Sequence, residues 1–225
     1  MRARPIVAID GPAGAGKSTA ARRTAESLGF VLVDTGALYR GVALIAKERG
    51  VDLGDSEGVA EVARSLDLRF LSAADQEPRL WIDGEDRSEA IRSPEISGSA
   101  SVVSAHGAVR DALLDLQRRL GQAGGVVLEG RDIGTVVFPD AEVKIYLTAS
   151  DEERARRRVD DLRTRGFEAD PEVVLREIRD RDRRDRERDV APLRIADDAI
   201  VVDTSDLSFD EVVVRLVEIA QTRSG

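Results

Sequence analysis

The sequence predicts an α/β fold built on a parallel sheet, with a smaller antiparallel sheet inserted into it. Three observations predict this architecture: short apolar runs alternate with helical patterns, a glycine-rich loop follows the first run, and one internal region carries a hairpin signal. At 225 residues the chain is longer than one average domain of about 150 residues and shorter than two. We therefore expect a single domain, residues 1–225, that carries a sizeable insert.

Five apolar runs have the character of buried parallel strands, because their apolar residues are consecutive rather than alternating. These runs cover residues 6–9, 30–33, 126–128, 143–147 and 200–202. Helical patterns separate most of them, at residues 18–27, 37–49, 109–120, 152–163, 171–188 and 210–220. Capping boxes at Ser150 with Glu153 and at Ser208 with Glu211, and a cap at Asp170 before Pro171, mark three helix starts. A five-stranded parallel sheet flanked by helices follows.

Residues 51–99 break this alternation and are expected to form the insert. Residues 68–71 and 79–82 have strand character, and the Asp83-Gly84 dipeptide after the second run is typical of a tight hairpin turn. We expect a small antiparallel sheet with Trp81 packed inside it, because aromatic side chains usually belong to a core. A binding role for Trp81 is the alternative.

Composition excludes several classes of site. The chain has no cysteine and a single histidine, His106, which excludes disulfide frameworks, cysteine zinc sites, thiol nucleophiles and histidine clusters. Its net charge of −9 argues against a nucleic-acid polymer as partner. The apolar runs fall far short of the ~20 residues that cross a bilayer, so we expect a cytoplasmic protein without a membrane partner. With no exposed heptad or apolar patch evident, we expect a monomer, and a surface role for His106.

The strongest local signal is the loop after the first strand. Residues 11–18 match G-x-x-x-x-G-K-[ST] in full, with a predicted strand before the loop and a predicted helix after it. The glycines let successive backbone N–H groups converge on a phosphate, Lys17 reaches the β- and γ-phosphates, and the Ser18 hydroxyl is a ligand for Mg²⁺. We therefore predict a nucleoside triphosphate site; a glycine-rich turn that binds nothing is the alternative.

Other residues indicate which kind of nucleotide chemistry to expect. The chain contains no asparagine, so it lacks the Asn-Lys-x-Asp base reader of GTPases. Glu129, the nearest candidate for the catalytic glutamate of a motor ATPase, leads into Gly130-Arg131-Asp132, which has more the character of a ligand site. Ligands of open α/β sheets bind beyond the carboxyl ends of the strands, where residues 34–36 and 130–132 are predicted to lie. A small-molecule kinase fits these features best.

Arginine accounts for nearly all of the basic charge, since only three of the 34 basic residues are lysines. Arginine binds phosphate and carboxylate groups in a bidentate manner. Arg181, Asp185 and Arg188 are spaced to share one helical face, as are Arg154 and Arg158 on the preceding helix. Residues 151–189 form either a solvated, salt-bridged hairpin or an arginine-bearing lid over transferring phosphates, and composition leaves both possibilities open.

Four segments together resemble the bacterial cytidylate kinase family of P-loop nucleoside monophosphate kinases. They are GPAGAGKST at 11–19, DTGALYR at 34–40, GRDIGTVVFP at 130–139 and RDRRDRERDVAPL at 181–193. The resemblance implies a nucleoside monophosphate kinase fold, with residues 51–99 as the subdomain that binds the monophosphate and 151–189 as an arginine-rich helical lid. It also implies ATP-dependent phosphorylation of CMP and dCMP to CDP and dCDP. A kinase for another small acceptor and a nucleotide-binding module without transfer activity are the alternatives.

The resemblance also implies roles for single residues. ATP is expected to bind the loop residues Gly11, Pro12, Ala13, Gly14, Ala15, Gly16, Lys17, Ser18 and Thr19, with Mg²⁺ on Ser18. The sugar and phosphate of the acceptor are expected near Thr35, Arg40, Arg131, Arg181, Asp185 and Arg188. Thr35 replaces the serine common in the family and retains its hydroxyl group.

The same resemblance places the cytosine base near Ser101, Arg110 and Asp132. This assignment is chemically reasonable, because Asp132 can accept a hydrogen bond from the N4 amino group while Arg110 and Ser101 donate to N3 and O2. Lys17, Arg157 and Arg158 are expected to act on the transferring phosphoryl group. Arg154 lies in the same lid segment, and the sequence does not distinguish which of these lid arginines meets the γ-phosphate.

Overall fold

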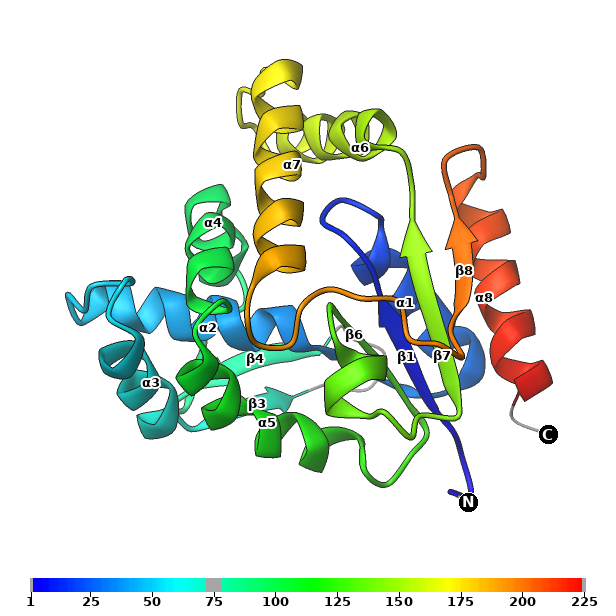
Figure 1. Ribbon diagram of the computed structural model, residues 1–225, viewed down its shortest axis with the longest axis horizontal. Coiled ribbons are helices and arrows are strands. Elements are labelled where there is room, and N and C mark those ends of the chain that lie inside the picture. Colours follow the sequence, from blue (N-terminus) through cyan, green and yellow to red (C-terminus); the bar gives the residue numbers. More distant parts are fainter. Residues whose placement is uncertain (1, 72–77, 224–225) are drawn as a thin grey trace. The chain divides into compact units, whose positions relative to one another are not determined.

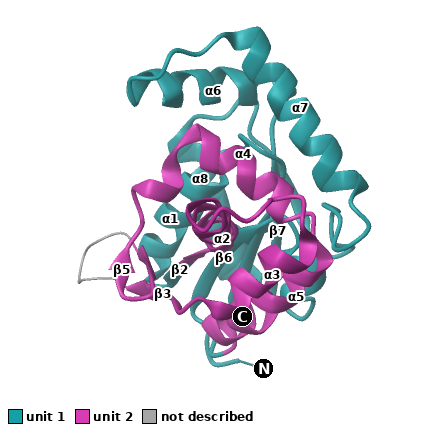
Figure 2. Ribbon diagram, turned by 90° about the vertical axis from the view of Figure 1, so that its left-hand side faces the viewer, with its two compact units in different colours: residues 1–32, 123–225 teal, residues 33–122 magenta. Residues whose placement is uncertain are grey.

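The computed structural model describes residues 2–71 and 78–223 (Figure 1). The chain divides into two compact units, one formed by residues 1–32 and 123–225 and the other by residues 33–122 (Figure 2). The predicted insert, residues 51–99, falls within the second unit. Each unit contains hydrophobic clusters of its own.

The main sheet contains all five predicted strands. Its order is β2-β6-β1-β7-β8, with β1 at the centre. The strands are β1 (Ile6–Asp10), β2 (Val31–Asp34), β6 (Val126–Gly130), β7 (Val143–Thr148) and β8 (Ile200–Asp203). β1 pairs in parallel with β6 and β7, and β7 with β8, so the carboxyl ends of these strands meet at one edge.

Two of these strands are less buried than predicted. Every residue of β1 and β6 is buried, as consecutive apolar residues imply. β2 and β8 lie at the two ends of the strand order, and Val31 and Val201 are 61% and 50% exposed. An apolar run indicates that a segment is a strand. How exposed that strand is depends on whether other strands lie on both sides of it, and β2 and β8 have a neighbouring strand on one side only.

Helices of the first unit form two groups. α1 (Lys17–Leu28) and α8 (Phe209–Arg223) contact each other and share a hydrophobic cluster with residues of β1, β6, β7 and β8. α6 (Asp151–Thr164) follows β7, and α7 (Pro171–Glu187) packs against α6 through a small core of their own (Figure 1). A π-helix at Ile133–Val137 contacts β1 and β6.

The predicted helix caps are present with one difference. Asp170 accepts hydrogen bonds from the N–H groups of residues 172 and 173, and Ser208 and Glu211 bond reciprocally. Ser150 accepts from the Glu153 N–H, but the Glu153 carboxylate binds two arginines of α6. The Ser150 box is therefore only half formed, because charged partners within the helix compete for the glutamate.

The second unit combines helices with the predicted antiparallel sheet. Its helices are α2 (Thr35–Glu48), α3 (Ser56–Ser65), α4 (Pro94–Val103) and α5 (Gly107–Gly121), with a short 3-10 helix at Ala90–Arg92. The sheet has the order β3 (Leu68–Leu71), β4 (Arg79–Ile82), β5 (Glu85–Asp86). Asp83 and Gly84 both have positive φ values, 51° and 84°, as a tight hairpin turn requires. The hairpin prediction is confirmed.

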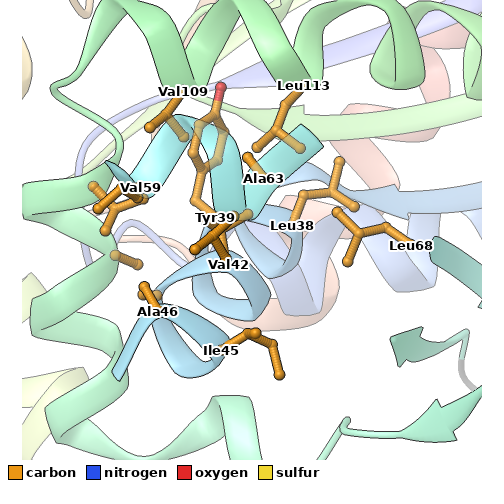
Figure 3. Close-up of a cluster of buried hydrophobic side chains, with 14 of the residues drawn as sticks. Leu38, Tyr39, Val42, Ile45, Ala46, Val59, Ala63, Leu68, Val109 and Leu113 are labelled. Carbon is orange, nitrogen blue, oxygen red and sulfur yellow. The ribbon is translucent and has the colours of Figure 1, made fainter. Parts of the chain in front are cut away.

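A buried cluster joins the helices and the sheet of this unit (Figure 3). Leu38, Tyr39 and Val42 of α2 belong to it, together with apolar residues of α3, β3, β4, α4 and α5. Leu80 and Ile82 supply the buried face of β4, whereas Trp81 points to the other face and is half-buried. Strand alternation assigns the buried core to the neighbours of Trp81, so that Trp81 is only partly buried, and its packing inside the insert stays a prediction.

Helices α3 and α4 were not predicted from the sequence. α3 is only ten residues long and owes its start to Asp55, whose carboxylate accepts from the Gly58 N–H at 3.1 Å. α4 contains glycine and three serines, residue types with weak helix propensity, and it is buried through Ile96, Ala100 and Val103. Tertiary burial rather than a strong local pattern explains both helices. None of the helices in the described part of the chain has the length and apolar character needed to cross a bilayer.

Candidate functional site

The phosphate-binding loop connects β1 to α1 as predicted. Gly11, Gly14 and Gly16 have φ values of 152°, 75° and 81°, which side-chain-bearing residues rarely adopt. A Cβ atom at Gly11 would lie 2.0 Å from the Leu147 carbonyl oxygen, so the loop also needs glycine there for space. α1 begins at Lys17 and has Gly16 as its N-cap, which has no side chain to cap the helix. The N–H groups of its first turn can therefore bind an anion.

Lys17 folds back on this loop. Its ammonium group is buried and donates a hydrogen bond to the Pro12 carbonyl oxygen at 2.7 Å. Burial, followed by the positive charge of Arg131, lowers the pKa of Lys17 from 10.5 to about 7, although Glu129 opposes the shift. An anionic ligand would favour the charged form of the lysine and reverse this shift.

Ser18 is the loop residue suited to hold a magnesium ion. Ser18, one position after Lys17, is exposed in the first turn of α1 and presents a hydroxyl oxygen, the kind of ligand that Mg²⁺ prefers. In the described part of the chain no three or more histidine, cysteine, aspartate or glutamate side chains group as a metal site. The hydroxyl group of Ser18 thus fits Mg²⁺ as a single protein ligand.

A second group of candidate site residues follows the carboxyl end of β6. Asp10, the last residue of β1, accepts hydrogen bonds from the N–H groups of Ile133 at 2.8 Å and Gly134 at 2.7 Å. Burial raises the pKa of Asp10 to about 6, although these two N–H groups lower it. A Cβ atom at Gly134 would come within 3.2 Å of the Lys144 side chain. Asp10 and Gly134 therefore hold the segment that presents Arg131 and Asp132.

Arg131 and Asp132 are each paired with a residue near the end of α7. Arg131 Nε donates to Asp185 Oδ2 at 2.8 Å, and Arg188 Nη2 lies 3.5 Å from Asp132 Oδ1. Burial raises the pKa of Asp185, but the positive charges of Arg131 and Arg181 outweigh it and hold the pKa below its ordinary value. The structure therefore brings together four predicted acceptor residues from segments some 50 positions apart in the sequence.

Arg188 reaches this cluster in a way that the sequence did not predict. α7 ends at Glu187, and Arg188 is its C-cap with an extended backbone. Arg188 Nε donates to the Ala191 carbonyl oxygen at 2.7 Å, and the Leu193 N–H donates to the Asp185 carbonyl oxygen at 2.7 Å. The prediction that Arg188 shares a helical face with Arg181 and Asp185 is wrong, because the chain turns back after α7.

The three α6 arginines considered above, Arg154, Arg157 and Arg158, differ in their environments. Arg154 is 1% exposed and bound to protein groups on all sides, so it is not available to a phosphate. Arg157 binds the hydroxyl and carbonyl oxygens of Thr204 at 2.9 and 2.7 Å, and its Nη1 would lie 3.9 Å from a Cβ atom at Gly16. Arg158 is partly exposed and pairs with Asp161 at 3.0 Å. The spacing that put Arg154 and Arg158 on one face did not reveal this difference.

The second unit holds the remaining predicted site residues. Thr35 is buried at the start of α2, and Arg40 pairs with Asp34, the N-cap of that helix, at 2.6 Å. Asp34 also accepts a hydrogen bond from the Ala37 N–H at 3.0 Å. The segment 34–40 is therefore held rigid by its own side chains.

Ser101 and Arg110 lie on consecutive helices, α4 and α5. The Ser101 side chain is 2% exposed, and its hydroxyl group finds no hydrogen-bond partner among the described residues. Arg110 donates to the Ser104 carbonyl oxygen at 3.2 Å, and its guanidinium lies 5.3 Å from the centre of the Tyr39 ring. A buried hydroxyl without a partner costs stability, so it indicates a place where a ligand supplies the missing bond.

Some residues near the site were not predicted from the sequence. Asp10 binds the N–H group of Ile133, which follows Asp132 and is 123 positions away, and the Tyr39 ring lies against Arg110, 71 positions away; no local pattern reveals these contacts. His106, expected on the surface, is half-buried, and its ring nitrogen bonds to the Leu53 carbonyl oxygen at 2.8 Å. Its role is therefore to hold the loop before α5.

Known proteins resemble this chain over nearly its whole length. The model of the family described as cytidylate kinase matches residues 7–222. A cytidylate kinase from Pelotomaculum thermopropionicum is 50% identical over 217 residues, which cover 96% of each chain. The bifunctional pantoate ligase/cytidylate kinase from Prochlorococcus marinus (strain MIT 9303) is 50% identical over 97% of this chain and 45% of that protein.

A solved structure supports the fold independently. Shikimate kinase from Acinetobacter baumannii, in complex with shikimate, superposes with a TM-score of 0.50 at 15% identity, covering 98% of this chain and 95% of the other. At that identity the likeness concerns the fold alone. The P-loop kinase architecture expected from the sequence is confirmed.

Proposed function

Because the chain belongs to the cytidylate kinase family, we propose that it transfers the γ-phosphoryl group of ATP to CMP and dCMP, giving ADP with CDP or dCDP. The observation that carries this proposal is the family match, which spans both the phosphate-binding loop and the acceptor residues. The enzyme is thus a phosphotransferase. A kinase for a different small acceptor is not favoured, because the acceptor segments are those of this family.

We place the donor at the loop between β1 and α1. Its N–H groups and Lys17 bind the phosphates of ATP, and the hydroxyl group of Ser18 would hold Mg²⁺. Bound Mg²⁺ supplies positive charge that neutralises the phosphate oxygens. The open first turn of α1 and the buried ammonium group of Lys17 support this assignment.

We assign the acceptor phosphate to a group of positively charged side chains. Arg131, Arg181 and Arg188 neutralise the phosphate of CMP, and Asp185 orients Arg131 and meets the sugar. Thr35 and Arg40 bind the same sugar–phosphate end. Guanidinium groups suit this task, since they form bidentate bonds with phosphate oxygens.

The cytosine base is recognised by Ser101, Arg110 and Asp132. The Asp132 carboxylate accepts from the N4 amino group of cytosine, while Arg110 and Ser101 donate to N3 and O2. Uracil presents a carbonyl oxygen where cytosine has the amino group, so Asp132 would face another acceptor. The unpartnered hydroxyl group of Ser101 supports a ligand at this position.

The chemical step needs no dedicated general base. An oxygen of the CMP phosphate is already an anionic nucleophile; it bonds to the γ-phosphorus of ATP as the bond from that phosphorus to the bridging oxygen of ADP breaks. Lys17, Arg157 and Arg158 stabilise the charge on the transferring group. Of the two lid arginines, Arg157 is the better candidate, since its guanidinium lies nearer to the loop glycines. Positioning and charge neutralisation supply the catalysis.

Other parts of the proposal concern the setting of the reaction. We propose that residues 51–99 act as the acceptor-binding subdomain and residues 151–189 as a lid that excludes water from the transferring group. We further propose that the enzyme works as a monomer in the cytoplasm, in pyrimidine nucleotide metabolism, without a membrane or nucleic-acid polymer as partner. The acidic net charge of −9 supports the last point.

An acceptor panel tests the proposal. ADP formation in the presence of ATP and Mg²⁺ would be measured with CMP, dCMP, UMP and AMP in parallel, with Lys17→Met as the inactive control. We expect the largest kcat/KM for CMP and dCMP. A larger value for another acceptor, or equal rates with and without any acceptor, would overturn the assignment.

A further inference from the structure

The first unit contains a buried ion pair between α6 and α7. Arg154 of α6 and Asp182 of α7 are 1% and 3% exposed, and their Nη1 and Oδ2 atoms lie 2.7 Å apart. Charged side chains are seldom buried to this extent unless the structure requires them in that place.

Both members of the pair form hydrogen bonds with one residue of the phosphate-binding loop, Ala13. Arg154 Nη1 donates to the Ala13 carbonyl oxygen at 2.7 Å, and the Ala13 N–H donates to Asp182 Oδ1 at 3.1 Å. Both peptide groups of Ala13 are therefore occupied by lid residues 141 and 169 positions away. The Ala13 N–H points to a carboxylate, which leaves phosphate binding to the N–H groups that follow it in the loop.

Arginine is the side chain that this position requires. Besides Ala13, the Arg154 guanidinium donates from Nε to the Ala149 carbonyl oxygen at 3.1 Å and from Nη2 to Asp151 Oδ1 at 2.5 Å. A planar fork of donors can serve these acceptors in different directions, whereas the single ammonium group of lysine cannot. The loop leaves space for the Arg154 side chain because residue 14 is glycine. A Cβ atom at Gly14 would lie 3.2 Å from Arg154 Cβ.

We propose that Arg154 and Asp182 are positioning residues that lock Ala13, so that the rest of the loop is preorganised for the phosphates of the donor nucleotide. The proposal rests on the proposed function, because it takes the donor to be ATP bound at this loop. It also links both helices of the predicted lid to the donor site through one residue, Ala13. Neither residue touches the nucleotide; each acts through the backbone of Ala13.

The chain offers a matched control. Arg179 also joins α7 to α6, by ion pairs to Asp151 and Glu152 at 2.9 Å each, but it is half-exposed and these pairs do not include the loop. Arg179 shares Asp151 with Arg154, but Arg179→Ala leaves both hydrogen bonds to Ala13 in place and removes a link between the same two helices. Asp182→Asn keeps an oxygen that can accept from the Ala13 N–H and removes the charge that faces Arg154, whereas Asp182→Ala removes both.

The test compares ATP binding with CMP use in the full-length protein. ATP affinity would be measured by calorimetry without acceptor, and KM for ATP and for CMP by ADP formation. We expect Asp182→Ala to weaken ATP binding about tenfold or more, the equivalent of one charge-assisted hydrogen bond, with KM for CMP changed less than about twofold. Asp182→Asn should fall between Asp182→Ala and wild type, and Arg179→Ala should match wild type.

The outcomes separate this proposal from the proposed function. Wild-type ATP affinity in both Asp182 variants, or an equal rise of both KM values, would overturn the positioning role. If Asp182→Ala fails to fold by circular dichroism, the partial loss expected in Asp182→Asn decides the matter. If the wild type binds ATP but does not phosphorylate CMP, the proposed acceptor is wrong. The ATP-binding measurements still test whether Arg154 and Asp182 position the loop through Ala13.

Discussion

Binding of ATP should be coupled to protonation of Lys17. In the free protein, burial and the charge of Arg131 lower the pKa of this lysine from 10.5 to about 7. Near pH 8 only about one tenth of the molecules then carry the proton, whereas a lysine in contact with phosphates is fully charged. Each ATP bound near pH 8 should therefore take up about 0.9 proton, and affinity should fall almost tenfold per pH unit above that.

Calorimetry measures this uptake directly. The binding enthalpy would be determined near pH 8 in buffers of different ionisation enthalpy, where the phosphates of ATP are already fully ionised. The slope against ionisation enthalpy gives the number of protons, and Lys17→Met, tested at higher protein concentration, should give a slope near zero. A zero slope in the wild type, with an ATP affinity that stays constant from about pH 7.5 to 9.5, would show that Lys17 is already charged in the free protein.

The same shift affects the stability of the free protein. Between about pH 7 and 10.5 the unfolded chain, with an ordinary lysine, binds more protons at this site than the folded chain does. The free energy of unfolding contributed by Lys17 should therefore rise with pH across that window. A saturating concentration of ATP should remove this rise, because the lysine is then charged in the folded protein as well.

Three further predictions concern the base site and the loop after β6. Asp132→Ala should reduce the preference for CMP over UMP, measured as the ratio of kcat/KM values, by about tenfold; an unchanged ratio would exclude Asp132 as the base reader. Ser101→Ala should raise KM for CMP without lowering the melting temperature, because the hydroxyl lacks a partner among the described residues; a lower melting temperature with unchanged KM would point to a structural role. Gly134→Ala should destabilise the protein by about 1 kcal/mol, since its Cβ atom would crowd Lys144. Gly98→Ala in α4 has no such neighbour and should be neutral or stabilising in the same denaturation experiment.

The features predicted correctly from the sequence are those specified within a few consecutive residues. The phosphate-binding loop needs three glycines with positive φ, a lysine and a helix start, and all of these occur within residues 11–18. The Asp83-Gly84 turn is local in the same way, because both residues adopt the positive φ that the hairpin demands. Strands such as β1 were evident because complete burial leaves a continuous apolar run.

The features that could not be predicted from the sequence depend on contacts between segments that are far apart in the chain. Arg154 and Arg158 have the same spacing pattern as any pair on one helical face, yet only Arg154 is enclosed, by Ala13 and Asp182. Asp10 gives no local sign that it will bind N–H groups more than 120 positions away. Arg188 reaches Asp132 because the chain turns after α7, and neither helical periodicity nor charge pattern contains that turn.

The most direct test of the account is to follow the phosphoryl group itself. The protein would be incubated with Mg²⁺, CMP and ATP labelled at the γ-phosphate, and the products separated by chromatography. We expect the label to appear in the β-phosphate of CDP, with one CDP formed for each ADP, and we expect Lys17→Met to form none. Label found only in inorganic phosphate, or ATP bound with no CDP formed, would contradict it.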